Sequence, residues 1–233
     1  MTAHSDNHEW LQQVKEEALE PELPICDPHH HLWDARAGAT QPRYLLHEMI
    51  DDLGGGHNIR STVFIECGAM FAQHRPYAFQ PVGETEFVKG IAAMSDSGMY
   101  GETRIAAGIV GTVDLKIGDE SGDVLDAHIE AAGGRFRGIR LGALWHPEEA
   151  IRNHRTDPPQ QLLLRDDFRQ GFKHLAPRRM SFEAWLCHEQ IPDVTDLARA
   201  FPDTIIVLDH FGGPLGIGSY AGRQDEVFEV WKT

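Results

Sequence analysis

The chain has 233 residues, 41% of them hydrophobic and 24% charged, which is ordinary globular composition for one large domain or two small ones. Its 36 acidic and 21 basic residues give a formal net charge of -15, which makes nucleic acids and anionic membranes poor partners. Three widely separated cysteines cannot form a disulfide framework. The chain shows no secretory signal and no run approaching the ~18 apolar residues of a membrane span, so we expect a soluble, cytoplasmic protein.

The first predicted element is a helix over residues 5–19. Its apolar residues form a stripe at a spacing of four, and acidic residues fill its first turn. Pro21 and Pro24 then end the helix and force an extended chain. We therefore treat residues 1–22 as an N-terminal helical extension and residues 23–233 as the main domain.

Six short apolar runs follow, several of them rich in β-branched residues, and they predict buried strands at 23–27, 59–67, 104–110, 135–141, 181–187 and 204–210. The segments between them have helical spacing, at 43–53, 84–98, 123–134, 165–175 and 192–201. Gly133 and Gly134 fit a helix C-terminus, and Pro192 fits a first helical turn. This alternation predicts an α/β fold with a parallel sheet, in which the loops after the strands carry the chemistry.

The stretch LPICDPHHHLWD places three histidines directly after the first predicted strand. Alternate side chains of an extended segment point the same way, so His29 and His31 share one side and His30 takes the other. Two such imidazoles can reach one cation, although the pair alone does not name the metal. The plainer alternative is a chance cluster in a loop, and the position after a strand argues against it.

Two further histidines follow predicted strands. His210, in IIVLDHFGGP, ends the sixth strand before two glycines, and its alternative is a buried histidine bonded to a neighbouring strand. His188, in WLCHEQ, ends the fifth strand, where Gln190 competes for the inward-facing position.

Charged side chains also stand at strand ends. Arg140 closes the fourth strand and is suited to clamp a carboxylate or carbonyl oxygen, with a structural ion pair as the equal alternative. Glu66 closes the second strand and is a candidate ligand, proton-transfer group or partner of Arg140. Asp27 is expected to orient a ligand imidazole.

Other candidates are weaker. The remaining histidines, including His128, are expected at the surface, and only His146 after the fourth strand is kept as a possible site residue. The stretch GIGSYA at 216–221 matches a GxGxxA dinucleotide pattern, but a proline-bearing loop separates it from the strand. A flexible substrate loop is the preferred interpretation.

Five stretches together resemble the amidohydrolase-2 branch of the amidohydrolase superfamily, whose members include sugar and dicarboxylate lactonases. They are CDPHHHLWD, STVFIECGAM, GETEFVKGIAAMSDSGMYG, GRFRGIRL and FEAWLCHEQIPDVTDLARAFPDTIIVLDHFGGP. The resemblance implies a (β/α)8 TIM barrel with a metal on His29 and His31, and histidines after strands five and six that match His188 and His210. It also implies an aspartate after strand eight.

This chain departs from the family pattern in two ways. Leu141 stands where many relatives have a histidine, and only 23 residues follow His210. We therefore expect about six of the eight β/α units, without strands seven and eight or their aspartate, in a chain that is a fragment and has little turnover alone. A sheet open in this way also makes a homo-oligomer possible.

The expected function is hydrolysis of a lactone, or less favourably an amide, by a metal-activated water. Zinc is the expected cofactor, and a small molecule is the expected partner. His29, His31 and His188 would hold the metal, while His210, Arg140 and Glu66 would be catalytic. Arg140, Gln190 and Trp33 would bind substrate. The alternatives are decarboxylation of an unsaturated acid on the same barrel, or a non-catalytic fragment.

Overall fold

The computed structural model describes residues 13–14, 16–35, 43–152 and 156–232. The chain forms two compact units. Unit 1 comprises Met1–Val110 and Ile129–Arg135, and unit 2 comprises Gly111–His128 and Phe136–Thr233.

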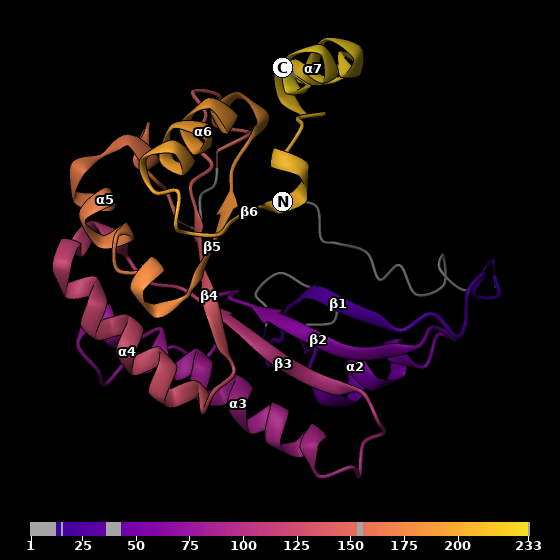
Figure 1. Ribbon diagram of the computed structural model, residues 1–233. Coiled ribbons are helices and arrows are strands. Elements are labelled where there is room, and N and C mark those ends of the chain that lie inside the picture. The colour runs from indigo at the N-terminus through magenta and orange to yellow at the C-terminus, as the bar shows by residue number, and fades with distance from the viewer. Residues whose placement is uncertain (1–12, 15, 36–42, 153–155, 233) are drawn as a thin grey trace. The chain divides into compact units, whose positions relative to one another are not determined.

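Strands and helices alternate along the chain, as the sequence predicts (Figure 1). The strands are β1 (Ile25–His30), β2 (Ile59–Ile65), β3 (Arg104–Gly111), β4 (Phe136–Gly142), β5 (Ser181–Trp185) and β6 (Ile206–Leu208). The helices are α2 (Leu46–Leu53), α3 (Val82–Asp96), α4 (Ser121–Ala132), α5 (Asp166–Phe172), α6 (Ile191–Ala200) and α7 (Gln224–Trp231). These elements are six β/α units of the expected (β/α)8 pattern, which confirms the α/β fold class.

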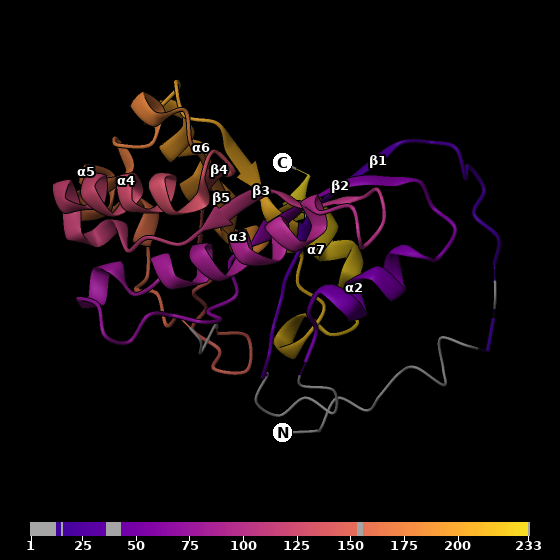
Figure 2. The ribbon, with the colours of Figure 1, turned by 90° about the horizontal axis from the view of Figure 1, so that it is seen from below.

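Unit 1 contains a parallel sheet in which β1 pairs with β2 and β2 with β3. Helix α3 lies along this sheet (Figures 1 and 2). Its Val88 and Ala92, four residues apart, are both fully buried, as are Phe64 of β2 and Ile109 of β3. The helical spacing therefore gives α3 one apolar face, and that face is buried.

Unit 2 repeats the arrangement, with β4 paired to β5 and β5 to β6, again in parallel. Its core is aromatic. Phe168 and Phe172 lie four residues apart on α5, and their ring centroids are 5.9 and 5.2 Å from that of Phe182 on β5. Phe201, just after α6, adds a fourth ring at 4.9 Å from Phe172. All but Phe201 are fully buried, so these rings join α5 and α6 to the sheet.

The expected helix ends are confirmed. Helix α4 ends at Ala132, and Gly133 and Gly134 follow with φ of 57° and 87°. Only glycine adopts this left-handed backbone without a steric cost. Pro192 lies in the first turn of α6, where its missing N–H is not needed.

Three expectations about helices and strands are wrong: one helix, the end of β1 and the length of β6. The described part of the predicted helix 5–19, residues 13, 14 and 16–19, is not helical. Val14 of its stripe is 68% exposed, so no packing stabilises a segment that is marginal alone. Strand β1 continues through His30 rather than ending before the histidines, and β6 has only three residues.

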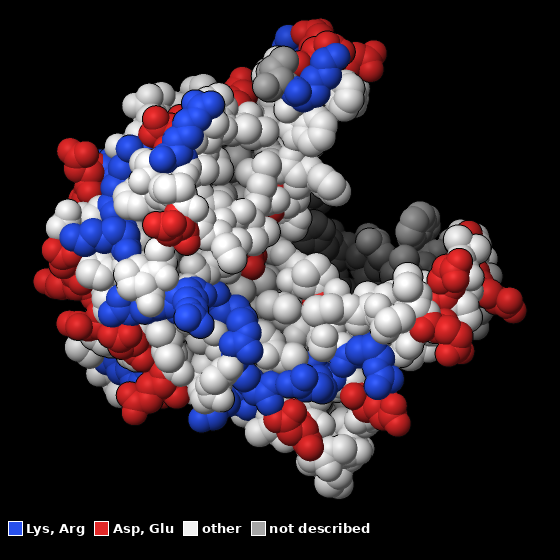
Figure 3. Space-filling view, viewed as in Figure 1, with Lys and Arg blue, Asp and Glu red and all other residues white. Residues whose placement is uncertain are grey.

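Basic and acidic side chains both lie on the surface seen in Figure 3. Several of the chain's charged residues form ion pairs within one unit. Arg135 pairs with Asp96 in unit 1, and Arg178 pairs with Asp126 at 2.7 Å in unit 2. Such exposed pairs contribute ~0–1 kcal/mol each, so they add little to stability. None of the helices in the described ranges has the length and hydrophobicity needed to cross a bilayer.

Candidate active site

The three histidines lie at the carboxyl end of β1 in unit 1. The ring centroids of His29 and His31 are 5.1 Å apart and nearly perpendicular. The Nδ1 atom of His31 lies 2.7 Å from the main-chain oxygen of Ile65, at the end of β2. A carbonyl oxygen only accepts, so Nδ1 carries the donated proton and Nε2 carries the lone pair. This is the tautomer that a metal-ligating histidine adopts when a second group orients it.

His30 faces the other way, as the alternation of a strand requires. Its ring is 8% exposed, and its Nε2 lies 2.9 Å from the hydroxyl of Thr62. It lines a cavity of about 300 Å³ together with Asp27, Tyr44 and α2 residues. Burial lowers the pKa of His30 to about 4, so this ring is neutral at physiological pH.

Asp27 and Trp33 flank the histidines. Asp27 accepts a hydrogen bond of 3.1 Å from the main-chain N–H of His29, so the contact fixes the backbone rather than the imidazole. Trp33 exchanges two main-chain hydrogen bonds with Tyr44, of 2.8 and 2.7 Å, and its ring lies 5.2 Å from that of His31. The indole is thus fixed beside one of the two candidate metal ligands.

Two buried carboxyl groups lie after β2. Glu66, the predicted site residue, is 2% exposed. Glu84, in the first turn of α3, is 1% exposed and accepts from the main-chain N–H groups of Cys67 and Ala69 at 3.1 and 2.7 Å. Burial, followed by repulsion from Glu66, raises the pKa of Glu84 to about 7. The sequence did not indicate Glu84, because acids are common in first helical turns.

In unit 2, Arg140 of β4 is 6% exposed, and its register partner on β5 is Glu183, 7% exposed. Register partners on parallel strands point to the same face of the sheet. The alternative role of Arg140, a structural ion pair, requires a neighbouring acid. Glu183 on the adjacent strand is such an acid. The sequence analysis missed Glu183, although an acidic residue inside the apolar run SFEAWLC is a signal that could have revealed it.

His188 and Gln190 form a single turn after β5. His188 is 3% exposed, and its Nδ1 has no hydrogen-bond partner among the described residues. Burial lowers the pKa of His188, against the opposing effect of the Glu189 carboxylate. The amide of Gln190 donates to the main-chain oxygen of Ala143 at 2.9 Å and accepts from the main-chain N–H of Trp145 at 3.1 Å. Gln190 thus joins the loops after β4 and β5, and its role in substrate binding stays a prediction.

His210 lies two residues beyond β6 and is exposed. It begins a left-handed run in which His210, Phe211, Gly212 and Gly213 have φ of 50°, 57°, 73° and 58°. For the two non-glycine residues this backbone costs about 1 kcal/mol or more each. Strain of this kind is concentrated at functional sites, and the role of His210 stays a prediction.

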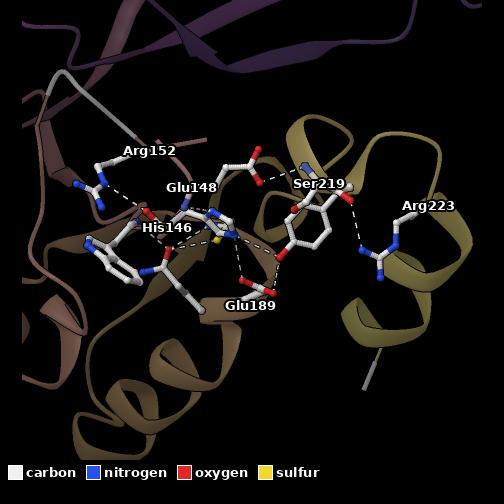
Figure 4. A network of polar contacts seen from close by, with 10 residues as sticks. His146, Glu148, Arg152, Glu189, Ser219 and Arg223 are labelled. Atoms are coloured by element: carbon white, nitrogen blue, oxygen red, sulfur yellow. Dashed lines mark hydrogen bonds and ion pairs between the residues drawn. The ribbon is translucent and has the colours of Figure 1, made fainter. Parts of the chain in front are cut away.

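His146, which the sequence marked only as possible, is 4% exposed and belongs to a polar network with Tyr220 and Glu189 (Figure 4). His128, by contrast, was expected at the surface and is fully buried. Its ring stacks on Phe136 at 5.0 Å, and burial lowers its pKa to about 4. Helical spacing alone did not reveal that position 128 faces the core.

The predicted site residues therefore form two groups. Unit 1 holds His29, His31, Trp33 and Glu66, and unit 2 holds Arg140, His188, Gln190 and His210. Each group lies at or just beyond the carboxyl ends of parallel strands. A family model described as Amidohydrolase matches residues 26–232. The chain belongs to the amidohydrolase family.

The chain is also similar to individual proteins. The chain is 30% identical over 209 residues to the uncharacterized protein y4mH of Sinorhizobium fredii (strain NBRC 101917 / NGR234), covering 82% of this chain and 63% of that protein. An amidohydrolase structure from Burkholderia multivorans with bound HEPES has a TM-score of 0.60 and 21% identity, covering 90% of this chain and 64% of that one. The amidohydrolase chain thus spans less than two thirds of the length of these relatives.

Two further solved structures share the fold. An amidohydrolase from Burkholderia multivorans with bound zinc has a TM-score of 0.58 and 19% identity over 90% of this chain and 66% of that one. A probable 2-pyrone-4,6-dicarboxylic acid hydrolase from Acinetobacter baumannii, with citric acid bound, has a TM-score of 0.52 and 15% identity over 90% and 65%.

Proposed function

We propose that this amidohydrolase is a metal-dependent hydrolase that opens the lactone ring of a small acid or sugar. The observation that carries the proposal is the pair of imidazoles at the end of β1, 5.1 Å apart, one of them held in a ligating tautomer by the Ile65 carbonyl. Neutral imidazole nitrogens suit zinc, and a relative of the same fold has zinc bound.

A divalent cation on His29 and His31 would supply Lewis acidity and a water acidic enough to be deprotonated near neutral pH. His188, in unit 2, stays a predicted metal ligand as well, because its ring is buried and burial keeps it neutral. Imidazole donors fit zinc better than magnesium or calcium, which prefer oxygen ligands.

The remaining predicted residues would act on the substrate. Arg140 would hold a substrate carboxylate or ring oxygen, because a guanidinium binds such groups bidentately. His210 would stabilise the oxyanion, and Glu66 would move a proton. Trp33 and Gln190 would line the bound molecule. A lactone is our choice because a pyrone, named for one solved relative, is itself a cyclic ester. We also propose a cytoplasmic location, since the described cysteines are unbridged.

Zinc binding tests the metal site directly. The full chain, loaded with zinc and desalted, is expected to retain about one equivalent, and a His29→Ala, His31→Ala double variant is expected to retain far less. A His47→Ala, His74→Ala variant is the matched control, because both side chains are exposed in the same unit. Equal zinc content in the two double variants would contradict the proposal.

Substrate class requires a second assay. A panel of sugar lactones and pyrone dicarboxylates is offered to the zinc-loaded chain, and acid release and carbon dioxide release are measured together. Ring opening gives one carboxylic acid and no carbon dioxide, whereas decarboxylation releases carbon dioxide. Acid release that disappears in the His29→Ala, His31→Ala variant supports a lactonase. Carbon dioxide release would identify a decarboxylase instead.

A further inference from the structure

The GIGSYA stretch of unit 2 is held in place by side chains from two other loops. We call residues 216–222 the strap, and it contains one 3₁₀ turn, Gly218–Tyr220. The main-chain N–H of Ser219 donates to the carboxylate of Glu148 at 3.1 Å, in the loop after β4 (Figure 4). Gly218 has φ of 58°, a left-handed backbone that favours glycine at this position.

The side chain of Tyr220 makes the second attachment. Its hydroxyl donates to Glu189 Oε1 at 2.5 Å, in the turn after β5. His146 supplies the hydroxyl with a donor, because its Nδ1 accepts from the main-chain N–H of Glu148 at 3.0 Å and its proton is therefore on Nε2. That Nε2 lies 3.3 Å from the Tyr220 hydroxyl. One chain of hydrogen bonds thus runs from the β4 loop through the strap to the β5 turn.

Tyr220 also contacts the candidate metal ligand of this unit. Its ring centroid is 5.5 Å from that of His188, at an angle of 84°, and 5.7 Å from that of His146. The Nδ1 of His188 has no hydrogen-bond partner in the described part of the chain. Among the described residues, Nδ1 therefore does not fix the His188 imidazole, and the Tyr220 ring packs against it.

We propose that Tyr220 is a positioning residue, anchored by Glu189 and His146, that sets the orientation of the His188 imidazole. The strap is then a built part of the site rather than a flexible substrate loop. The part of this inference that concerns metal binding rests on the proposed function, whereas the anchoring of the strap does not.

The test uses the full chain with Tyr220→Phe, which keeps the ring and removes the hydroxyl. Tyr77→Phe is the matched control, since Tyr77 is 81% exposed in unit 1. Hydrogen exchange of the Ser219 and Tyr220 amides is expected to accelerate roughly tenfold in Tyr220→Phe, because the strap loses its charge-assisted anchor. The control is expected to leave exchange unchanged.

Imidazole nitrogen NMR provides the second measurement. The ring signals of His146 and His188 are expected to shift in Tyr220→Phe, while those of His128 stay. Glu189→Gln keeps an acceptor for the hydroxyl and is expected to move these signals less than Glu189→Ala, which removes the acceptor and is expected to resemble Tyr220→Phe. Zinc affinity is expected to fall roughly tenfold in Tyr220→Phe as the His188 ring loses its orientation.

The outcomes separate the two proposals. A wild-type chain that binds no zinc overturns the proposed metal site, and exchange and NMR still decide whether the strap is anchored as inferred. A chain that binds zinc but shows the same exchange, ring signals and affinity in Tyr220→Phe as in wild type overturns the inference.

Discussion

Glu84 has one carboxylate oxygen that accepts two main-chain N–H groups and another, buried, that has no partner among the described residues. With its pKa raised by burial to about 7, it takes up a proton near neutrality in the folded chain, and only near 4.5 when unfolded. The folded state therefore binds more protons between these pH values, and folding stability falls as pH rises from 4.5 to 7. Over this pH range the free energy of unfolding decreases by about 3 kcal/mol.

Replacing Glu84 by Gln removes this titration. We expect the free energy of unfolding of Glu84→Gln, measured by urea titration, to decline less than that of wild type between pH 4.5 and 7.5. Glu86→Gln, on an exposed position of the same helix, is the control. Parallel pH profiles for Glu84→Gln and wild type would show that Glu84 is ionised throughout.

His128 titrates in the opposite sense. Its pKa is lowered to about 4 in the fold and is 6.5 when exposed, so the unfolded chain binds more protons between these values. Stability is lost as pH falls from 6.5 towards 4, again by about 3 kcal/mol. We expect His128→Gln, which retains a donor for the Thr112 carbonyl, to lose less stability than wild type from pH 7 to 5. His47→Gln, at the surface, should follow the wild-type profile.

At the residue scale, sequence patterns identified candidate residues at the ends of strands. They missed residues whose partners are brought to them only by the folding of the chain. The alternation of β1 was enough to put His29 and His31 on one side, and their rings are adjacent. Glu84 and Tyr220 could not be found this way, because their partners lie 15 and 31 or more residues away in sequence. The roles assigned to the predicted site residues stay predictions.

At the scale of elements, periodicity predicted all six strands and the helices from α2 to α6, because each buries one apolar face. The segment 5–19 has the same periodicity, but its described residues are exposed or half-buried and are not helical. Sequence patterns thus indicate which segments have an apolar face, and packing decides which of these segments form helices or strands. Boundaries at β1 and β6 were missed for a related reason, since polar histidines continue one strand and a strained turn ends the other.

The aromatic cluster of unit 2 gives a prediction at this scale. Phe172 contacts Phe182 and Phe201 and is fully buried. We expect Phe172→Ala to lower the free energy of unfolding by about 3–5 kcal/mol, through lost burial and the cavity left behind. Phe228→Ala, on α7 and 53% exposed, should cost well under half as much in the same urea titration. Equal losses would mean that α5 does not depend on this cluster.

At the scale of the whole molecule, β6 is the outer strand of unit 2 and is unusually apolar for its exposure. Val207 and Leu208 of this strand are 42% and 38% exposed, and the flanking residues Ile205 and Phe211 are 71% and 79% exposed. An exposed edge strand offers unpaired N–H and C=O groups to another chain, and apolar residues strengthen such pairing. Association of copies through this edge is our prediction, and it opposes the mutual repulsion of chains that each carry a charge of -15.

Sedimentation velocity measures this association. We expect the wild-type chain to associate increasingly with concentration, and more so in high salt, which screens the repulsion. Ile205→Lys should reduce association by placing a charge beside the edge. Met99→Lys, 83% exposed in unit 1, is the control for added charge alone. If both variants associate equally, the edge is not the contact.

The three unbridged cysteines differ sharply in what surrounds them. Burial raises the pKa of the Cys67 thiol to about 12 and that of Cys187 to about 11, so both hold their protons at neutral pH, whereas Cys26 is exposed. Maleimide dyes should therefore attach at a single position, three residues before His29. Fluorescence from that one dye would respond when zinc arrives at the histidines, without any cysteine having to be engineered.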